Sequence, residues 1–411
     1  MLCHLWKREN KVATKRIFKD FLRVIEYLLN AFWAIPIVLI SRVLYPKFKI
    51  KFGIVQSNRI GHFIPDTLEE IIRNQRHKRE ITFWATTSIS NEQWYRMIQN
   101  YIYIRPIFKC LVFWNRYIFG SQRHTSVMSA NSTKDLEGKF FSDLIKPKMS
   151  HSDISKSKQL LEKIGWSGEP IICLLSRDNA YLNYWDNATG QINYDRSYHS
   201  YRNSDIETYR LAINYLLDKG YWVFRMGSLS EKKLEIFHKN FLDYSFFNEK
   251  CDLLDIYLFS NCSGVISTST GIDVLSLAYG IPTLIVNGLP LGVAATFFNT
   301  IWVPKRLMWQ NKNKSLTVKE YIENFFSHTI DYSKAGIDII DLNDMEIANA
   351  VVELLDRIEG RERIYDEEVK LQETFVNLLR NWKEYSSYHG FIHPGFKLGK
   401  DWIYSMRNNM S

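Results

Sequence analysis

Cysteine is scarce in this 411-residue chain, and its few copies are not arranged in pairs. A disulfide framework needs an even set of cysteines and a structural zinc site needs closely spaced ones, so neither is expected. Two of the five lie in apolar, strand-like runs that are typical of small buried thiols. This usage fits the reducing cytoplasm. The cysteines are Cys3, Cys110, Cys173, Cys251 and Cys262, with Cys173 and Cys262 in the apolar runs.

The body of the chain lacks an excess of basic charge. The formal net charge is +9, yet residues 1–51 contain eleven Lys and Arg against three acidic residues, a local net of +8. The remainder is therefore nearly neutral. A basic face that binds nucleic acid is not expected on the main body, because such a face concentrates Lys and Arg.

A hydrophobic run long enough to span a bilayer is also missing near the N-terminus. The longest uncharged run there, 27–41, is interrupted by Pro36 and falls short of the roughly 18–20 residues that a span needs. No small-residue cleavage site of a signal peptide clearly follows it. Apolar residues recur at helical spacing across 17–29, with Lys and Arg on both flanks. We therefore expect residues 15–45 to lie on an anionic membrane surface. A short tilted transmembrane anchor and a helix packed on the protein's own core are the alternatives.

Internal repeats and low-complexity tracts are absent, and the chain alternates between short apolar strands and amphipathic helices. This alternation predicts an α/β fold with parallel sheets that are covered on both faces. Residues 109–115 are compatible with a strand or a buried helix. The expected strands are 50–56, 80–86, 170–175, 221–226, 263–267 and 283–287. The expected helices are 63–77, 91–103, 154–164, 205–219 with Ser204 as its N-cap, 231–241, 254–260, 271–279, 344–358 and 367–383.

The same pattern divides the chain into four parts. The predicted parts are a basic amphipathic segment (1–48), a first Rossmann-like domain (49–165), a second one (166–335) and C-terminal helices that pack across both lobes (336–411). A polar hinge region is expected at 145–170.

A polar turn follows the strand predicted at 263–267. Ser269, Thr270 and Gly271 stand where a new helix is expected to begin, and backbone N–H groups at a helix start attract phosphate. Ligands of open α/β sheets bind at this end of the strands. The simpler alternative is that Ser269 or Thr270 only caps the helix.

The run from this turn through Gly280-Ile281-Pro282 resembles the nucleotide-sugar half of glycosyltransferases with two facing Rossmann-like domains, the GT-B architecture. The chain after residue 48 also resembles a bacterial family of glycosyltransferase-like proteins that is associated with surface-polysaccharide loci. The matching motifs are Arg59-Ile60-Gly61-His62, Ser176-Arg177-Asp178, Tyr198-His199-Ser200-Tyr201-Arg202-Asn203, Arg225-Met226-Gly227 and Ser269-Thr270-Gly271.

The chain departs from the GT-B pattern at one place. Many of those enzymes hold the donor ribose with a glutamate in the helix before the G-x-P motif. Asp273, near the start, is the only acidic residue of the corresponding helix here, and Ser276 and Tyr279 occupy later positions. The sequence therefore does not show how a ribose would be held, and Asp273 is counted among the candidate donor-binding residues.

Three arginines are expected to bind the donor. Arg177 and Arg225 end or follow neighbouring strands, and Arg202 lies in the loop between them. In a parallel sheet Arg177 and Arg225 would face the same edge as the Ser269 turn, where guanidinium groups clamp a diphosphate. No DxD sequence occurs, so we expect neither a metal nor another cofactor. A surface ion pair is the alternative role for each arginine.

The candidate catalytic residues are His62 and Asp178. His62 follows Arg59 and Gly61 in a loop that resembles the acceptor side of some GT-B enzymes, and a histidine suits general-base work near neutral pH. Asp178 is a rival base, and Asp66 a weaker one. His62 could instead pack or cap a helix. His199 is a further candidate for contact with the donor.

These observations favour a glycosyltransferase that moves a sugar from a nucleotide-sugar to a saccharide or polyprenyl-linked acceptor in surface-polysaccharide biosynthesis. It would work in the cytoplasm, at the periphery of the inner membrane. A nucleotide-sugar epimerase or hydrolase of the same fold is an alternative. A non-catalytic membrane scaffold of a polysaccharide assembly complex is another.

Overall fold

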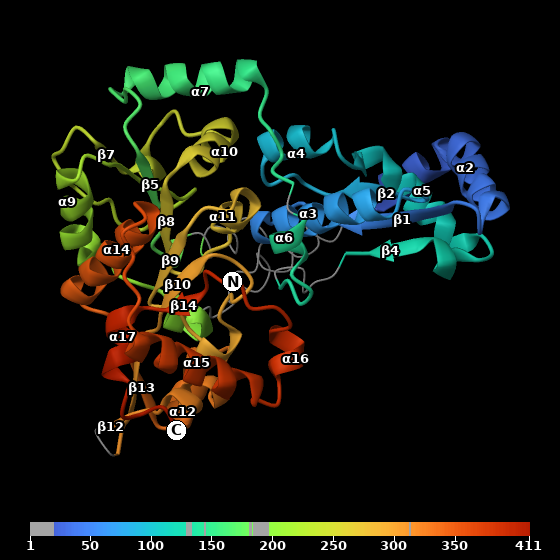
Figure 1. Ribbon diagram of the computed structural model, residues 1–411. Coiled ribbons are helices and arrows are strands. Elements are labelled where there is room, and N and C mark those ends of the chain that lie inside the picture. The colour runs from blue at the N-terminus through green and yellow to red at the C-terminus, as the bar shows by residue number, and fades with distance from the viewer. Residues whose placement is uncertain (1–19, 129–133, 144, 181–182, 184–196, 312–313) are drawn as a thin grey trace, which may run out of the picture.

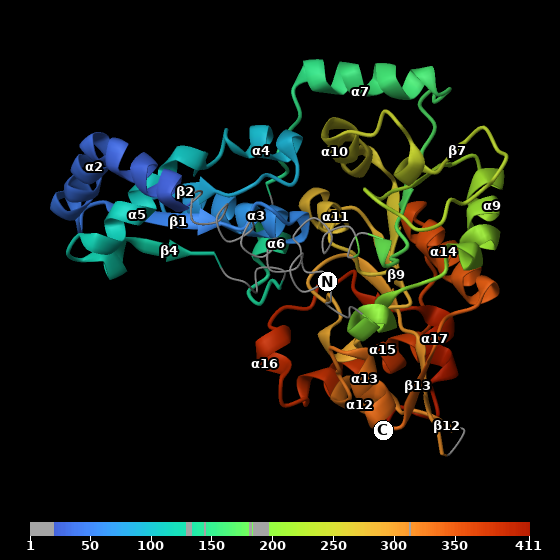
Figure 2. The ribbon, with the colours of Figure 1, turned by 180° about the vertical axis from the view of Figure 1, so that it is seen from behind.

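The computed structural model describes residues 20–128, 134–143, 145–180, 183, 197–311 and 314–411. Figures 1 and 2 show two parallel sheets side by side, which we call the N-terminal lobe (20–128) and the C-terminal lobe (from residue 171 on). Helix α7 (His151–Lys163) lies across the top of both views and connects them. The Ser150 hydroxyl accepts a hydrogen bond from Asp153 N and caps this helix, within the region predicted as a hinge.

The N-terminal lobe contains a four-stranded sheet in the order β3-β2-β1-β4, with all strands parallel. The central strand β1 pairs in register with β2 from Lys49–Glu80 to Val55–Thr86. Residues 109–115, open between strand and helix, form α5, because Cys110, Leu111 and Asn115 are buried at helical spacing. The elements are α2 (Ala31–Leu44), β1 (Lys49–Val55), α3 (Ile60–Arg76), β2 (Glu80–Thr86), α4 (Glu92–Ile98), β3 (Tyr103–Ile104), α5 (Lys109–Tyr117) and β4 (Thr125–Val127).

The C-terminal lobe is built on a seven-stranded parallel sheet in the order β14-β10-β9-β8-β5-β6-β7. Counted from β5, its first six strands follow the doubly wound order 3-2-1-4-5-6. β5, β6, β8, β9 and β10 are buried at every residue, as expected when helices cover both faces. The strands are β5 (Ile171–Leu174), β6 (Trp222–Arg225), β7 (Phe241–Leu242), β8 (Gly264–Ser267), β9 (Thr283–Val286), β10 (Thr300–Val303) and β14 (Lys397–Leu398); the covering helices include α9 (Arg210–Asp218), α10 (Asp252–Asn261), α11 (Val274–Tyr279) and α14 (Asp344–Ile358).

The last part of the chain adds more than helices. β11 (Arg306–Trp309) forms a small antiparallel sheet with β12 (Lys314–Ser315) and β13 (Ile337–Ile340), and β14 extends the large sheet. The remaining helices are α12 (Val318–Glu323), α13 (Thr329–Lys334), α15 (Asp366–Arg380), α16 (Tyr385–Tyr388) and α17 (Lys400–Ser405). The tail also contacts the segment between the lobes, since Phe391 packs against Phe141. The three predicted domain boundaries remain predictions.

Four local predictions are wrong, two of them at the candidate site. Residues 231–241 contain no helix, because Leu234 N donates to Asp243 and the Lys232 carbonyl accepts from Arg225, which holds the segment extended. Ser204 is not a cap; the Asp205 side chain accepts from Glu207 N and begins a 3-10 turn at 206–209 instead. At the candidate site, Gly61 and His62 lie in the first turn of α3, which begins at Ile60, and not in the predicted acceptor-side loop. The fourth correction, at α11, follows below.

A shared apolar core joins the two lobes. Phe63, Ile64 and Leu68 of α3 belong to the same buried cluster as Tyr257 of α10 and Leu275 of α11. The interface is therefore a packed one, and it holds the start of α3 against the carboxyl edge of the large sheet.

Candidate functional site at the carboxyl edge of the large sheet

The candidate site lies where the order of the large sheet reverses. Successive connections run from β5 outward to β6 and β7, but from β8 outward to β9 and β10. Crossovers that leave in opposite directions open a crevice at the carboxyl ends of β5 and β8, and ligands of doubly wound sheets bind there. The segments that follow these two strands, 175–178 and 268–271, carry the sequence-predicted residues.

The turn after β8 has a constrained backbone. Ser269 has φ +59°, a left-handed conformation that residues other than glycine seldom adopt and that concentrates at functional sites. The buried Asp273 carboxylate fixes the turn: its Oδ2 accepts from Ser267 Oγ at 2.7 Å and from Thr270 N at 2.8 Å. Burial raises the pKa of Asp273 to about 6, while these hydrogen bonds act in the opposite direction.

Two predictions about this turn need correction. The helix expected at 271 begins only at Val274 and is short, and Thr270 N already donates to Asp273. The predicted phosphate site at a helix start is therefore not formed here. Asp273, predicted to bind the donor, instead organises the turn from inside. The Thr270 hydroxyl is buried and has no hydrogen-bond partner among the described residues.

The structure brings Arg177 and Arg202 to this turn. Arg177 N donates to Thr268 Oγ1 at 3.0 Å, which ties the exit of β5 to the exit of β8. The Arg202 guanidinium donates to the Ser269 carbonyl. Burial raises the pKa of the Tyr201 phenol, and the positive charges of Arg202 and Arg177 oppose this rise. The backbone of Arg177 and the guanidinium of Arg202 thus contact the turn, and the role of both residues in donor binding remains a prediction.

Arg225 pairs with Asp243, whereas Arg177 and Arg202 contact the turn after β8. Its side chain at the end of β6 is buried, and its Nη1 is 2.8 Å from Asp243 Oδ2 in a buried ion pair. A carboxylate inside the protein thus already balances the charge that was predicted to clamp a diphosphate. No local pattern in the sequence marks this pairing, because Asp243 lies 18 residues away after a different strand.

A cavity of about 440 Å³ opens beside Arg177. Its wall carries four basic and four acidic side chains, so it is not a purely cationic pocket. Lys305, which the sequence reasoning missed, donates to Asp341 at 2.5 Å and to the Asn203 carbonyl at 2.6 Å. The charged residues of the wall are Arg177, Arg225, Lys232, Lys305, Asp178, Asp205, Glu231 and Asp341.

Asp178, in the wall of this cavity, accepts hydrogen bonds from two backbone N–H groups. Its Oδ1 accepts from Ala180 N at 3.0 Å and its Oδ2 accepts from Glu231 N at 2.8 Å. Both oxygens of the predicted rival base are therefore engaged by backbone groups, which hold the loops after β5 and β6 together.

Asn287, which the sequence analysis also missed, connects loops at the carboxyl edge of the large sheet. Asn287, at the end of β9 with φ +56°, donates to Ser204 Oγ at 2.8 Å and accepts from Leu342 N at 2.8 Å. An asparagine just after an apolar strand was the available signal, since asparagine tolerates the left-handed region.

The start of α3 closes the crevice from the other lobe. A side chain at Gly61 would bring its Cβ to 3.1 Å from both Cα and the carbonyl oxygen of Gly271, so the two backbones touch. A side chain at Gly61 would require the Gly271 backbone to move by a few tenths of an ångström, so glycine suits this close approach. Arg59, at the N-cap of α3, is exposed.

His62 stands one residue beyond this contact. Its Nδ1 is buried without a hydrogen-bond partner among the described residues. Burial, followed by the charge of Arg59, lowers the pKa of His62. The ring is therefore neutral near pH 7 and able to accept a proton. The side chain of His199 lies outside those that the structure describes.

Comparisons with known proteins do not assign a family. No family model matches the chain, and no curated protein matches it. Among solved structures, ADP-heptose lipopolysaccharide heptosyltransferase II from E. coli aligns with a TM-score of 0.33 and 12% identity, over 57% of this chain and 84% of that one. A protein assigned as a UDP-N-acetylglucosamine 2-epimerase from Listeria monocytogenes aligns with a TM-score of 0.29 and 10% identity, over 77% and 99%. Likenesses this weak carry no argument about activity, so function must be argued from this chain's own geometry.

Proposed function

We propose that this protein is a glycosyltransferase that uses a nucleotide-sugar donor at the crevice between the ends of β5 and β8. One observation carries the proposal: the contact of Gly61 with Gly271 puts the neutral His62 next to a turn that two arginines approach. A fold alone would not indicate a reaction, so the proposal rests on a candidate base that lies beside a turn which Arg177 and Arg202 also contact.

The cationic side of the crevice suits the donor diphosphate. Guanidinium groups bind phosphate oxygens through paired hydrogen bonds, and Arg177 and Arg202 belong to the segments that line the crevice. The partnerless hydroxyl of Thr270 adds a hydrogen-bond donor at the same turn. In this proposal Arg225 and Asp273 support these groups from inside and do not touch the donor.

The proposed reaction is a single displacement at the anomeric carbon. The acceptor hydroxyl oxygen forms the new C–O bond while its proton passes to the His62 ring. The bond between the anomeric carbon and the phosphate oxygen breaks, and its electron pair leaves with the nucleoside diphosphate. The arginines would offset the charge that develops on this leaving group, which removes the need for a metal ion.

The acceptor that we propose is a saccharide or a polyprenyl-linked saccharide of a surface polysaccharide. It would approach from the α3 side, because His62 and the exposed Arg59 border the crevice there. Among the described residues, no group of His, Cys, Asp and Glu could hold a metal ion. Independence from metal nevertheless remains part of the proposal.

Thermal unfolding of the protein with UDP, GDP, CMP and their sugar conjugates, with and without Mg²⁺, tests the donor site. A nucleotide at about 100 times its Kd stabilises the folded state by about 2.7 kcal/mol, which raises the midpoint measurably. Arg202→Ala and Thr270→Val should abolish or weaken the shift, whereas Arg79→Ala, an exposed arginine on the N-terminal lobe, should leave it unchanged.

Three results would contradict the proposal. If no nucleotide shifts the folded wild type, the donor site is absent and a non-catalytic scaffold fits better. If the nucleotide binds but Arg202→Ala and Arg79→Ala respond alike, the site lies elsewhere. If the nucleotide-sugar is isomerised or hydrolysed at full rate without an acceptor, the reaction is that of an epimerase or hydrolase.

A further inference from the structure

The helix α2 is apolar on two opposite sides. Its inner side buries Ala34 and Val38 against the N-terminal lobe. Its outer side exposes Phe32, Leu39, Ile40 and Val43, which recur at helical spacing. A helix that is apolar all round is normally enclosed on all sides, so the outer side of α2 lacks the apolar surroundings that its sequence requires.

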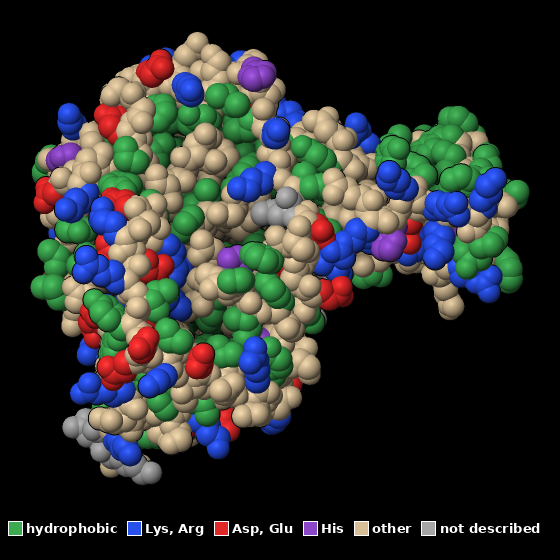
Figure 3. Space-filling view, in the orientation of Figure 1, with side chains coloured by type: hydrophobic (Ala, Val, Ile, Leu, Met, Phe, Trp, Pro, Cys, Tyr) green, Lys and Arg blue, Asp and Glu red, His purple; other side chains and the backbone are tan. Residues whose placement is uncertain are grey.

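The exposed apolar surface continues beyond α2. The helix Asp20–Leu29 before it exposes Phe21, Leu22, Val24, Leu28 and Leu29. Tyr117, the last residue of α5, and Phe119, in the loop after it, are 71% and 97% exposed. We call these residues, with Phe32, Leu39, Ile40 and Val43, the distal apolar surface. Figure 3 shows hydrophobic side chains gathered at this end of the molecule with Lys and Arg among them.

Specific contacts hold the three segments of the distal apolar surface together. Arg42 of α2 donates from Nε to the Phe119 carbonyl at 2.8 Å and from Nη2 to Asn115 Oδ1 at 2.6 Å. Tyr27 stacks on Phe113 with ring centroids 4.1 Å apart. The exposure of Phe119 is therefore built into a fixed loop and is not the result of a loose end.

The charge around this surface points to the kind of partner. Residues 20–51 carry five basic and two acidic side chains, and residues 103–124 carry four basic and no acidic ones. A cationic margin around exposed apolar side chains matches the anionic headgroups and acyl chains of a membrane. A second copy of this chain would instead bring two positive margins together, which is unfavourable.

The geometry favours a helix pair that lies in the membrane plane. No single described helix is long and apolar enough to cross a membrane, and Asp20–Leu29 and Ala31–Leu44 meet the criterion only as a pair bent by 67°. The inner side of α2 is packed with Phe52 and Ala85 of the sheet, so α2 cannot leave the lobe to span a bilayer. Its outer side is free to enter the headgroup region.

We propose that the distal apolar surface docks the protein on an anionic membrane, with Phe119 as an anchor supplied from outside the N-terminal segment. The sequence predicted a membrane contact for residues 15–45 alone. The structure adds the α5 loop, and with it a rigid surface that does not depend on the nucleotide crevice.

Flotation of the full chain with vesicles tests this docking. The vesicles are phosphatidylcholine alone or with about 30% phosphatidylglycerol, an anionic lipid. The wild type should float with the anionic vesicles and less with the neutral ones. Phe119→Ser should lower the partition coefficient about 10-fold, because a partly inserted phenyl ring is lost. Phe237→Ser is the matched control, since Phe237 is 98% exposed on the other lobe, and it should change nothing.

A second variant guards against local effects at the loop. Val43→Ser, on the outer side of α2, should also weaken flotation, and thermal unfolding should confirm that both variants fold. The proposal is overturned if the wild type ignores anionic vesicles, or if Phe237→Ser loses as much binding as Phe119→Ser. It is also overturned if Phe119→Ser splits a dimer in sedimentation velocity while the wild type does not float, because the surface would then be a protein interface.

Discussion

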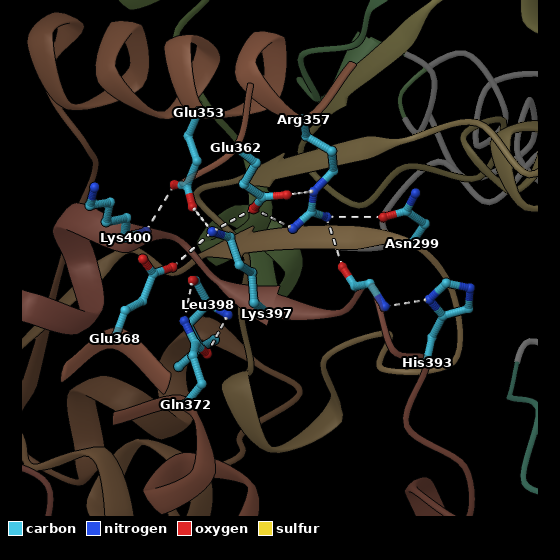
Figure 4. A network of polar contacts seen from close by, with 11 residues as sticks. Asn299, Glu353, Arg357, Glu362, Glu368, Gln372, His393, Lys397, Leu398 and Lys400 are labelled. Atoms are coloured by element: carbon cyan, nitrogen blue, oxygen red, sulfur yellow. Dashed lines mark hydrogen bonds and ion pairs between the residues drawn. The ribbon is translucent and has the colours of Figure 1, made fainter. Parts of the chain in front are cut away.

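The two ends of the molecule differ in which kind of side chain they expose to water. At the distal end of the N-terminal lobe apolar side chains point outward, whereas in the C-terminal lobe charged side chains are enclosed and matched. Lys397 of β14 lies 2.6, 2.7 and 2.8 Å from Glu353, Glu362 and Glu368 (Figure 4). In the docking proposed above, lipid would cover the distal apolar surface, whereas the protein itself encloses the charges around Lys397.

The ion pairs of Lys397 with Glu353, Glu362 and Glu368, which we call the Lys397 network, connect with further polar contacts. Arg357 of α14 pairs with Glu362 at 3.2 Å and donates to Asn299 Oδ1 and the Gly395 carbonyl (Figure 4). Burial alone would lower the pKa of Lys397, but the three carboxylates raise it well above its ordinary value. The network joins β14, α14 and α15, which explains how a two-residue strand stays on the edge of the large sheet.

The largest predicted effect comes from breaking this network. Lys397→Met should destabilise the protein by about 3–5 kcal/mol, because Glu353 and Glu368 would be left in the interior without their cation, while Glu362 would keep only Arg357. Urea unfolding measures the loss. Lys319→Met, at an exposed lysine 4.0 Å from Glu323, is the control and should cost less than about 1 kcal/mol. Equal losses in the two variants would contradict the contrast.

Unlike the carboxylates that pair with Lys397, the buried carboxyl of Asp66 has no basic partner among the described residues. Burial, followed by the charge of Glu69, raises the pKa of Asp66 to about 7. The folded state thus retains a proton that the unfolded state releases, and stability falls as pH rises from about 4 to about 7. Asp66→Asn should remove this loss and stabilise the protein at pH 8 by about 1–3 kcal/mol relative to pH 5.

Urea unfolding of Asp66→Asn at several pH values gives the profile. Asp218→Asn, at an exposed position on α9, is the control and should follow the wild type. A wild-type profile that does not fall toward pH 7, or an Asp66→Asn profile parallel to it, would mean that the carboxyl is solvated in the folded protein.

A smaller effect is expected from the way in which helices α14 and α2 begin. α14 begins with a capping box between Asn343 and Glu346, whereas α2 begins without a side-chain cap. Asn343→Ala should cost about 1 kcal/mol of stability, the usual value of an N-cap. The exposed Asn408→Ala should cost almost nothing. A loss of the same size at both positions, seen by chemical denaturation, would show that the cap is not formed in solution.

The smallest effect is expected at the distal apolar surface in water. Val43→Ser removes an apolar side chain that is 83% exposed, so the stability of the lipid-free protein should change by less than about 0.5 kcal/mol. A core substitution nearby, Leu111→Ala, should cost about 2–5 kcal/mol. If Val43→Ser is as costly as Leu111→Ala in thermal or urea unfolding, the outer side of α2 is already covered.

Much of the fold follows from local patterns in the sequence. The buried strands β1, β2, β5, β6, β8 and β9 were predicted, because continuous apolar runs between turn residues are typical of parallel strands. The strand β14 and the sheet of β11, β12 and β13 were not predicted. Several of these strands are only two residues long, and contacts distant in sequence hold them in place, so no local period marks them.

Those parts of the candidate site whose position follows from the ends of parallel strands were predictable. Arg177 and Ser269 were placed at one edge because the carboxyl ends of parallel strands share an edge. The role of Arg225 was missed, since its partner Asp243 comes from another strand. The contact of Gly61 with Gly271 joins two lobes, and nothing in either local sequence predicts which glycines meet.

The central claim is that one ligand occupies the crevice where Gly61 meets Gly271. Hydrogen–deuterium exchange of the wild type, with and without the nucleotide that stabilises it most, tests this most directly. The account predicts slower exchange in residues 59–63 and 267–273 together, because the ligand would order both walls. Protection confined to the cavity beside Arg361 and Lys400, or protection of neither segment by a nucleotide that binds, would contradict it.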